Sequence, residues 1–197
     1  MAYLRSLVYT GDPRRYALLV LVILIPGVVL GVCSSWFDRH RTLRRALGLV
    51  ALAVYVRYVL HTTVFARVSG GVVSVRLVPF WSYRECLEWT DTGLRVVAPD
   101  ILEQIVLNYA LYLPLGYLLA FALPEAFGDG SVAGGTVCVG LVAATVSLSC
   151  EVAQLLMQSG WAEYDDVFGN TVGAVLGYLF YCMARAASSR RVLDRER

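Results

Sequence analysis

The chain has 197 residues, of which 58% are hydrophobic and only 16% charged, and its formal net charge is +2. Soluble domains carry about a quarter charged residues, so this composition argues against a soluble domain of useful size. The basic residues form no concentrated basic face, which argues against a nucleic-acid-binding protein. The five cysteines show neither C-x-x-C nor Cys/His spacing, which argues against a zinc site or a disulfide framework.

The apolar residues come in five blocks, at 16–36, 46–66, 101–123, 134–157 and 167–187. Each block is near the length of about 20 residues that a helix needs to cross a bilayer. We therefore predict an all-α polytopic membrane helix bundle with about five transmembrane helices. Its parts are an extra N-terminal helix with a basic cytoplasmic link (1–45), a four-helix membrane domain (46–187) and a basic C-terminal tail (188–197).

The first block follows Arg14 and Arg15, as the core of a secretory signal would. The block is long for a signal core and no small-x-small cleavage site follows it, so we expect a retained helix.

Arginine clusters predict the orientation of the bundle, because short loops rich in arginine stay in the cytoplasm. One cluster lies in 39–45 and the other in 185–197. Both fall inside if the N-terminus is outside and the C-terminus inside, although Arg5, Arg14 and Arg15 then lie outside. This orientation places the links 67–100 and 158–166 on the outer side of the membrane.

The second block carries Arg57 and His61, four residues apart and therefore on one helical face. At 1.5 Å per residue, their predicted depths bracket that of Glu151 in the fourth block. Both are candidate ligand-binding residues. Alternatively, one of them pairs with Glu151 to hold the bundle together, or His61 is a satisfied interior histidine.

The long link 67–100 is predicted to form an outer hairpin or a half-inserted loop. Residues 72–78 are β-prone, and three aromatic residues suit the membrane interface: Trp81, Tyr83 and Trp89. Arg67 and Arg76 could bind an anionic group, or they could pair with the acidic residues of the links.

The third block places Gln104, Asn108, Tyr112 and Gly116 at intervals of four, so they share one face. Asn108 is a candidate ligand-binding residue, or it makes a hydrogen bond between helices. Pro114 is expected to kink this helix, with a neighbouring helix contacting the freed carbonyl.

The fourth block contains a carboxylate within an apolar stretch, Glu151, on one predicted face with Ser147, Gln154 and Gln158. An ionisable residue in hydrocarbon costs several kcal/mol, so a partner or a function must stabilise it. Glu151 is the candidate general acid or base, or a cation ligand, and Gln154 is its companion in a candidate catalytic site. The alternative is a purely structural ion pair.

The fifth block opens with Asp165, Asp166 and Asn170. Asp166 joins the candidate catalytic residues, whereas Asp165 and Asn170 are candidate ligand-binding residues. Either aspartate could instead cap the helix. Their surplus charge could bind a divalent cation, although the spacing matches no standard metal loop, and no other cofactor is predicted. A repeated G-x-x-x-G (169, 173, 177) predicts close helix packing.

Four segments in order resemble the VanZ-like family of small bacterial membrane proteins. They resemble N-x-x-P-F at 76–80 with the Asn lost, N-x-x-x-F-x-P-x-G at 108–116, S-x-x-x-E-x-x-Q at 147–154, and D-D-x-x-x-N-T-x-G-A at 165–174. The resemblance covers roughly 46–182, and Arg67 fits an Arg that the family has at that helix end. Many members have Gly-Arg before the acidic segment, where this chain has Gly160-Trp161, so Arg76 or Arg84 would have to substitute.

The resemblance implies a four-helix core with both ends inside and a role in the cell envelope. The family is named for a protein that lowers susceptibility to teicoplanin, a glycopeptide antibiotic with a lipid tail. The leading hypothesis is that the chain binds or modifies a lipid-linked cell-wall precursor or a lipoglycopeptide at the outer membrane face. The alternative is a non-catalytic scaffold or binding protein for envelope-synthesis enzymes. Whether a reaction is catalysed stays open.

Overall fold

The computed structural model of the chain describes residues 37, 39–66, 74–128 and 130–195. The predicted N-terminal helix (16–36) and Arg67 lie outside these residues.

Four segments of the described chain are long and apolar enough to span a membrane: Arg41–Phe65, Pro99–Ala122, Val132–Leu156 and Tyr164–Ser188. They correspond to α4 (Arg41–Leu60) with the π-helical turn η1 (His61–Phe65), α6 (Pro99–Ala122), α7 (Val132–Leu156) and most of α8 (Tyr164–Arg195). At 1.5 Å per residue, 25 residues reach about 38 Å, beyond the roughly 30 Å of a hydrocarbon core. The prediction of an all-α membrane bundle is thus confirmed for blocks two to five.

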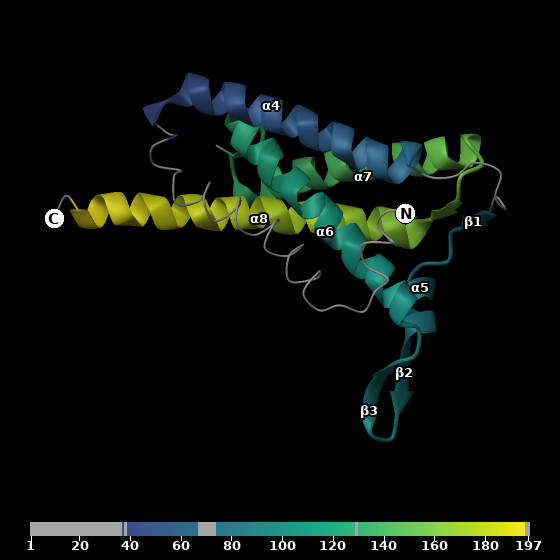
Figure 1. Cartoon of the computed structure of the whole chain (residues 1–197). Coiled ribbons are helices and arrows are strands. Elements are labelled where there is room, and N and C mark those ends of the chain that lie inside the picture. Colours follow the sequence, from purple (N-terminus) through teal and green to yellow (C-terminus); the bar gives the residue numbers. More distant parts are fainter. Residues whose placement is uncertain (1–36, 38, 67–73, 129, 196–197) are drawn as a thin grey trace.

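The helices alternate in direction, and α6 crosses between α4 and α8 (Figure 1). A second π-helical segment, η2 (Pro124–Gly128), joins α6 to α7. The hydroxyl of Ser131 caps α7 by accepting a hydrogen bond from the Gly134 amide at 3.0 Å.

Glycines set the distance between α6 and α8. A Cβ atom added at Gly116 would lie 1.8 Å from the Ala174 carbonyl oxygen, and one at Gly177 would lie 1.8 Å from that of Leu113. At Gly173 the nearest α6 carbonyl oxygen would be only 2.3 Å away. Side chains cannot occupy these positions without separating the helices, so the predicted packing role is confirmed for Gly173 and Gly177. At Gly169, the first glycine of the repeat, an added Cβ would meet only ordinary contacts from 3.4 Å.

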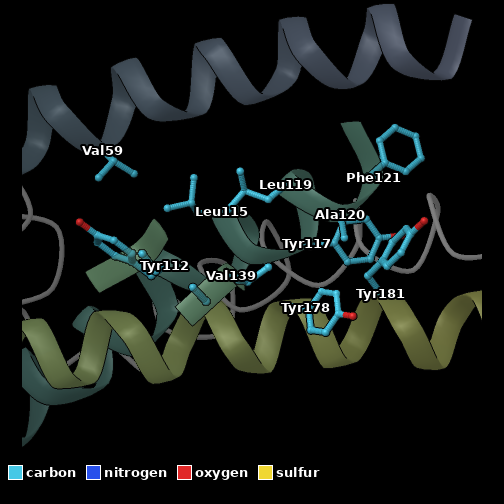
Figure 2. Close-up of a cluster of buried hydrophobic side chains, with 12 residues drawn as sticks. Val59, Tyr112, Leu115, Tyr117, Leu119, Ala120, Phe121, Val139, Tyr178 and Tyr181 are labelled. Atoms are coloured by element: carbon cyan, nitrogen blue, oxygen red, sulfur yellow. The ribbon is translucent and has the colours of Figure 1, made fainter. Parts of the chain in front are cut away.

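Aromatic rings fill the apolar core beside this contact. Tyr117 packs edge-on against Tyr181 with ring centroids 5.5 Å apart, and it stacks on Phe121 at 6.3 Å. Figure 2 shows these rings with Tyr178 between the ribbons of α6 and α8, while Val59 approaches from α4.

Pro114 lies inside α6, where its missing N–H leaves the carbonyl of Ala110 without its usual helical donor. The hydroxyl of Tyr55 on α4 donates to the next carbonyl, that of Leu111, at 2.8 Å. A neighbouring helix therefore supplies a donor at this stretch of backbone.

The connection between α4 and α6 contains β1 (Ser74–Arg76), α5 (Trp81–Cys86) and a hairpin of β2 (Leu87–Thr90) and β3 (Gly93–Val96). Strand β1 pairs in parallel with β4 (Trp161–Glu163), which lies between α7 and α8. Residues 74–76 of the predicted β-prone stretch form a strand, and the link contains a hairpin, although residues 87–96 form it and β1 pairs with β4 instead. All these elements gather at the end of the bundle where α7 ends and α8 begins (Figure 1).

The predicted face of the fourth block is shorter than expected. Helix α7 ends at Leu156, and Gln158 is exposed with a positive φ of 51°. Gln158 therefore does not continue the row of Ser147, Glu151 and Gln154, because the backbone has already left the helix.

Candidate functional site

Polar side chains are buried together at the end of the bundle where α7 meets α8. We call this set the polar cluster; its members are Asn108, Ser147, Glu151, Gln154, Glu163, Asp165, Asp166 and Asn170. Burying so many polar groups in an apolar bundle is costly unless each group finds a partner. The hydrogen bonds of each member therefore show what the cluster can do.

Helix α7 contributes one inward row. Ser147, Glu151 and Gln154 lie four and three residues apart on one face, and Glu151 is only 5% exposed. One carboxylate oxygen of Glu151 accepts a hydrogen bond from the Glu163 amide at 3.2 Å. Glu151 lies five residues before the end of α7, about 7.5 Å along the helix axis. The structure thus places this carboxylate inside the bundle near one end.

Helices α6 and α8 meet through an amide–carboxylate contact. The side-chain amide of Asn108 donates to Asp166 Oδ1 at 2.6 Å, and that of Gln104 approaches the same oxygen at 3.4 Å. The structure therefore brings Asn108 and Asp166 together and shows the hydrogen bond between helices that was one of the two alternatives for Asn108.

Asp165 fastens α5 to α8. Its carboxylate accepts from the backbone amides of Phe80 at 2.6 Å and Ser82 at 2.9 Å, and also from the Ser82 hydroxyl. Charge-assisted bonds of this kind are about twice as strong as neutral ones. Asp165 thus acts as an acceptor for the first turn of another helix and does not cap its own.

The contact of Asp165 with Phe80 and Ser82 was not expected from the sequence, and Ser82 was not singled out at all. Phe80 has left-handed backbone angles (φ 59°, ψ 26°), which are uncommon for a bulky residue. Its ring packs edge-on against Phe168 at 5.1 Å, and its amide donates to Asp165. The Pro79-Phe80 pair, which lies in the family-like segment 76–80, predicts a turn from the sequence, and the structure has a turn at these two residues.

Two buried acceptors in the polar cluster have no hydrogen-bond donor among the described residues. They are Gln154 Oε1, on a side chain only 1% exposed, and Asn170 Oδ1. The amide nitrogen of Asn170 donates to the Ser147 hydroxyl at 2.8 Å, so its oxygen alone is left unpaired. An unpaired buried acceptor costs about 1–3 kcal/mol, and such a group calls for an explanation.

Arg76 lies at the border of the polar cluster, between two indole rings. Its guanidinium carbon is 4.1 Å from the ring centroid of Trp81 and 4.0 Å from that of Trp161. The strand register places Arg76 opposite Glu163. Trp161 follows Gly160, at the position where the family resemblance led us to expect an arginine. Arg84, the other candidate substitute, is exposed on α5.

The structure does not bring Arg57 and His61 into the polar cluster. Both side chains are exposed, on α4 and η1, so the proposed pairing of either with the buried Glu151 is not observed. Helix α4 packs on α6 through residues such as Gly48, Tyr55 and Val59, and this rotation turns Arg57 and His61 away.

The α5 segment is itself well desolvated. The hydroxyls of Tyr83 and Tyr109 lie 2.7 Å apart, and burial together with this hydrogen bond raises the pKa of Tyr83 above its ordinary value. Burial also raises the pKa of the Cys86 thiol. Both groups therefore stay neutral at physiological pH.

Among the described residues, no group of three or more His, Cys, Asp or Glu side chains is arranged to hold a metal ion. Asp165 and Asp166 use their oxygens to accept the hydrogen bonds described above. A cation in the polar cluster would have to combine fewer than three carboxylates with amide and hydroxyl oxygens.

A protein-family model described as VanZ/LLP1 matches residues 46–185. The matched range contains every member of the polar cluster, together with α5 and the β2–β3 hairpin. Searches of curated proteins and of solved structures find no match.

Proposed function

Because this chain belongs to the VanZ/LLP1 family, we propose that it is a bacterial cell-envelope membrane protein whose polar cluster binds a lipid-linked or lipidated ligand. One observation carries the proposal. Gln154 Oε1 and Asn170 Oδ1 are buried acceptors with no donor in the part of the chain that the structure describes, and they lie in the same polar cluster as the Glu151 carboxylate. A ligand that supplies donors would offset the cost of burying them.

The chemistry of the cluster selects the kind of ligand. The two unpaired carbonyl oxygens accept from hydroxyl or ammonium donors, and with the Glu151 carboxylate in the same cluster they would repel a phosphate. Sugars of a lipid-linked cell-wall precursor and the amino or hydroxyl groups of a lipoglycopeptide supply such donors. The apolar helix faces around the cluster suit the lipid tail, and Arg76 at the border suits an anionic linker such as a phosphate.

The acidic residues divide into two roles in this proposal. Asp165 accepts hydrogen bonds from Phe80 and Ser82, and Asp166 accepts one from Asn108. These two aspartates therefore attach α5 and α6 to α8. Glu151, with Gln154 and Asn170 beside it, is the carboxylate that would contact the ligand. In a catalytic version, Glu151 accepts a proton from an attacking hydroxyl as a general base, and in a binding version it only orients the ligand.

The orientation of the bundle is part of the proposal. Arg41 and Arg45 at the start of α4 and Arg185 near the end of α8 lie at the end opposite the polar cluster (Figure 1). The positive-inside rule then puts the cluster at the outer face and the C-terminus inside. Fusions of a reporter to the C-terminus and to the 124–130 link test this arrangement; an outside C-terminus would contradict it.

The first test measures susceptibility to teicoplanin in a susceptible bacterial host with and without the full chain. We expect reduced susceptibility, lost in Glu151→Gln and kept in Glu125→Gln, an exposed carboxylate in η2 at the opposite end. Equal susceptibility with and without the chain would remove the link to teicoplanin.

The second test measures binding directly, with the purified chain in lipid nanodiscs and either teicoplanin or a polyprenyl-linked sugar as the probe. Loss of a hydrogen bond to a charged group costs about 1.5–3 kcal/mol, so Glu151→Gln should weaken binding by about tenfold or more. Conversion of the sugar probe by the wild type and not by Glu151→Gln would establish the catalytic version. Unchanged affinity in this variant would contradict the proposed pocket.

A second candidate function is a scaffold for envelope-synthesis enzymes, favoured by the contacts of Asp165, which are satisfied without any ligand. In that case Glu151 is structural, and Glu151→Gln should fail to accumulate in the membrane. Normal accumulation with lost activity would exclude this alternative.

A hard cation is a further candidate occupant of the same oxygens. Added Mg²⁺ or Ca²⁺ should then raise the melting temperature of the wild type but not of Glu151→Gln. No shift in the wild type would exclude a divalent cation site.

A further inference from the structure

The β2–β3 hairpin has one apolar face and one polar face. Its register pairs Leu87 with Val96, Glu88 with Arg95, and Trp89 with Leu94. Directly opposed residues share a face and successive residues alternate. The first and third pairs therefore form one apolar face, while the Glu88–Arg95 pair lies on the other. Opposite charges on that second face suit water.

The apolar face of the hairpin is largely uncovered by the protein. Trp89 is 82% exposed and Leu94 is 54% exposed, and Val96 is exposed as well. Burying such side chains away from water would be favourable. Contiguous exposed apolar patches therefore mark interaction sites.

The position of the hairpin identifies what it faces. Its base is closed by a hydrogen bond from the Val97 amide to the Cys86 carbonyl at 2.9 Å. The membrane-spanning helix α6 begins three residues after β3, at Pro99. Figure 1 shows the hairpin extending sideways from the bundle, across the direction of α8, at the end where α6 begins. A hairpin that extends sideways from a membrane-spanning bundle can reach the lipid around that bundle.

We propose that the β2–β3 hairpin is a membrane-interface anchor that inserts Leu87, Trp89, Leu94 and Val96 into the boundary between headgroups and acyl chains. Tryptophan favours this boundary because its ring is apolar and its N–H is polar. Glu88 and Arg95 then point to the aqueous side, as in other amphipathic elements that lie in the interface plane.

The anchor would also fix the height of α5, because Cys86 ends α5 and Leu87 begins β2. The other end of α5 is held by Asp165. The polar cluster would thus lie beneath an element attached both to α8 and to the membrane surface.

The first experiment uses tryptophan fluorescence of the full chain in lipid vesicles. Subtracting the signal of Trp89→Phe from that of the wild type isolates Trp89. We expect strong quenching by lipids brominated near the headgroup end of the acyl chain and weak quenching by aqueous iodide. Strong iodide quenching would place Trp89 in water and overturn the proposal. Quenching by neither would show that protein covers this face, such as the N-terminal segment, and would overturn it too.

The second experiment uses Arg95 as a built-in trypsin site in vesicles that expose this end of the bundle. The double variant Trp89→Ser/Leu94→Ser should leave the surface, so cleavage after Arg95 should accelerate by about tenfold or more. Thr90→Ser, on the polar face, is the matched control and should not change the rate. Equal rates in the wild type and the double variant, with the bundle intact on gel filtration, would overturn the anchor whatever ligand the polar cluster binds.

Discussion

Helices α6 and α8 touch in two chemically different ways along their length. Through the middle of the bundle, Gly116, Gly173 and Gly177 let the two backbones touch directly. Nearer the end with α5, the contact consists of the polar pair Asn108 and Asp166. The glycine contact tolerates no added atom, whereas the polar contact depends on which groups donate and which accept. The first region brings the two backbones into contact, and beside the second, on α7, lies Gln154, whose Oε1 has no donor among the described residues.

The largest expected effect is at the glycine contact. Gly177→Leu would drive a side chain into the Leu113 carbonyl, so we expect a loss of about 3 kcal/mol or more in stability and little folded protein in the membrane. The loss of stability is measured by unfolding the purified variant in a detergent titration. Gly140→Ala is the control, because an added Cβ there meets only ordinary contacts at 3.6 Å. Equal stability of both variants would contradict the close-packed contact.

The next largest effect is expected at Asp165. Asp165→Asn removes the negative charge that the Phe80 and Ser82 donors share, at a cost of about 2 kcal/mol. The bundle should stay folded while α5 loosens, so hydrogen exchange should quicken at residues 80–86 and not in α6. Asp91→Asn, an exposed carboxylate between β2 and β3, should leave the exchange unchanged. If residues 80–86 exchange as slowly in Asp165→Asn as in Asp91→Asn, Asp165 does not hold α5 in place.

A smaller effect is expected at Arg76. Arg76→Lys keeps the charge but loses the flat guanidinium between Trp81 and Trp161, at a cost of about 1 kcal/mol. The membrane-spanning helices should be unaffected, whereas β1 should separate from β4. Faster hydrogen exchange at residues 74–76 would show this separation. The exposed Arg84→Lys is the matched control.

The smallest effect is chemical and leaves the fold intact. Because burial raises the pKa of Cys86, its thiolate fraction at pH 8 is lower than that of a free cysteine. A water-soluble maleimide should therefore label Cys86 slowly in the folded protein and at an ordinary rate after denaturation in SDS. Raising the pH from 7 to 9 should increase the folded rate without reaching a plateau. Rapid labelling at pH 7, located by peptide mapping, would show that the α5 end is open.

Much of the bundle could be predicted from residue type and length alone. Apolar blocks two to five became four membrane-length helices, because a span of about 20 apolar residues has few other stable states. The shared face of Ser147, Glu151 and Gln154 follows from helical periodicity and did not need a partner to be known.

The partners of the polar residues could not be predicted in the same way. Asp165 binds Phe80 and Ser82, which lie more than 80 positions earlier in the chain, and no local pattern encodes that contact. Arg57 and His61 share a helical face as expected, but the rotation of α4 against α6 leaves that face exposed.

The sequence by itself determined where the chain is apolar, where it carries charge and which glycines allow helices to approach, since these depend only on composition and period. The tertiary structure alone decided which polar faces meet and which acceptors stay unpaired. The physical reason is that helix rotation and the docking of α5 depend on the fit between distant surfaces, which periodicity does not specify.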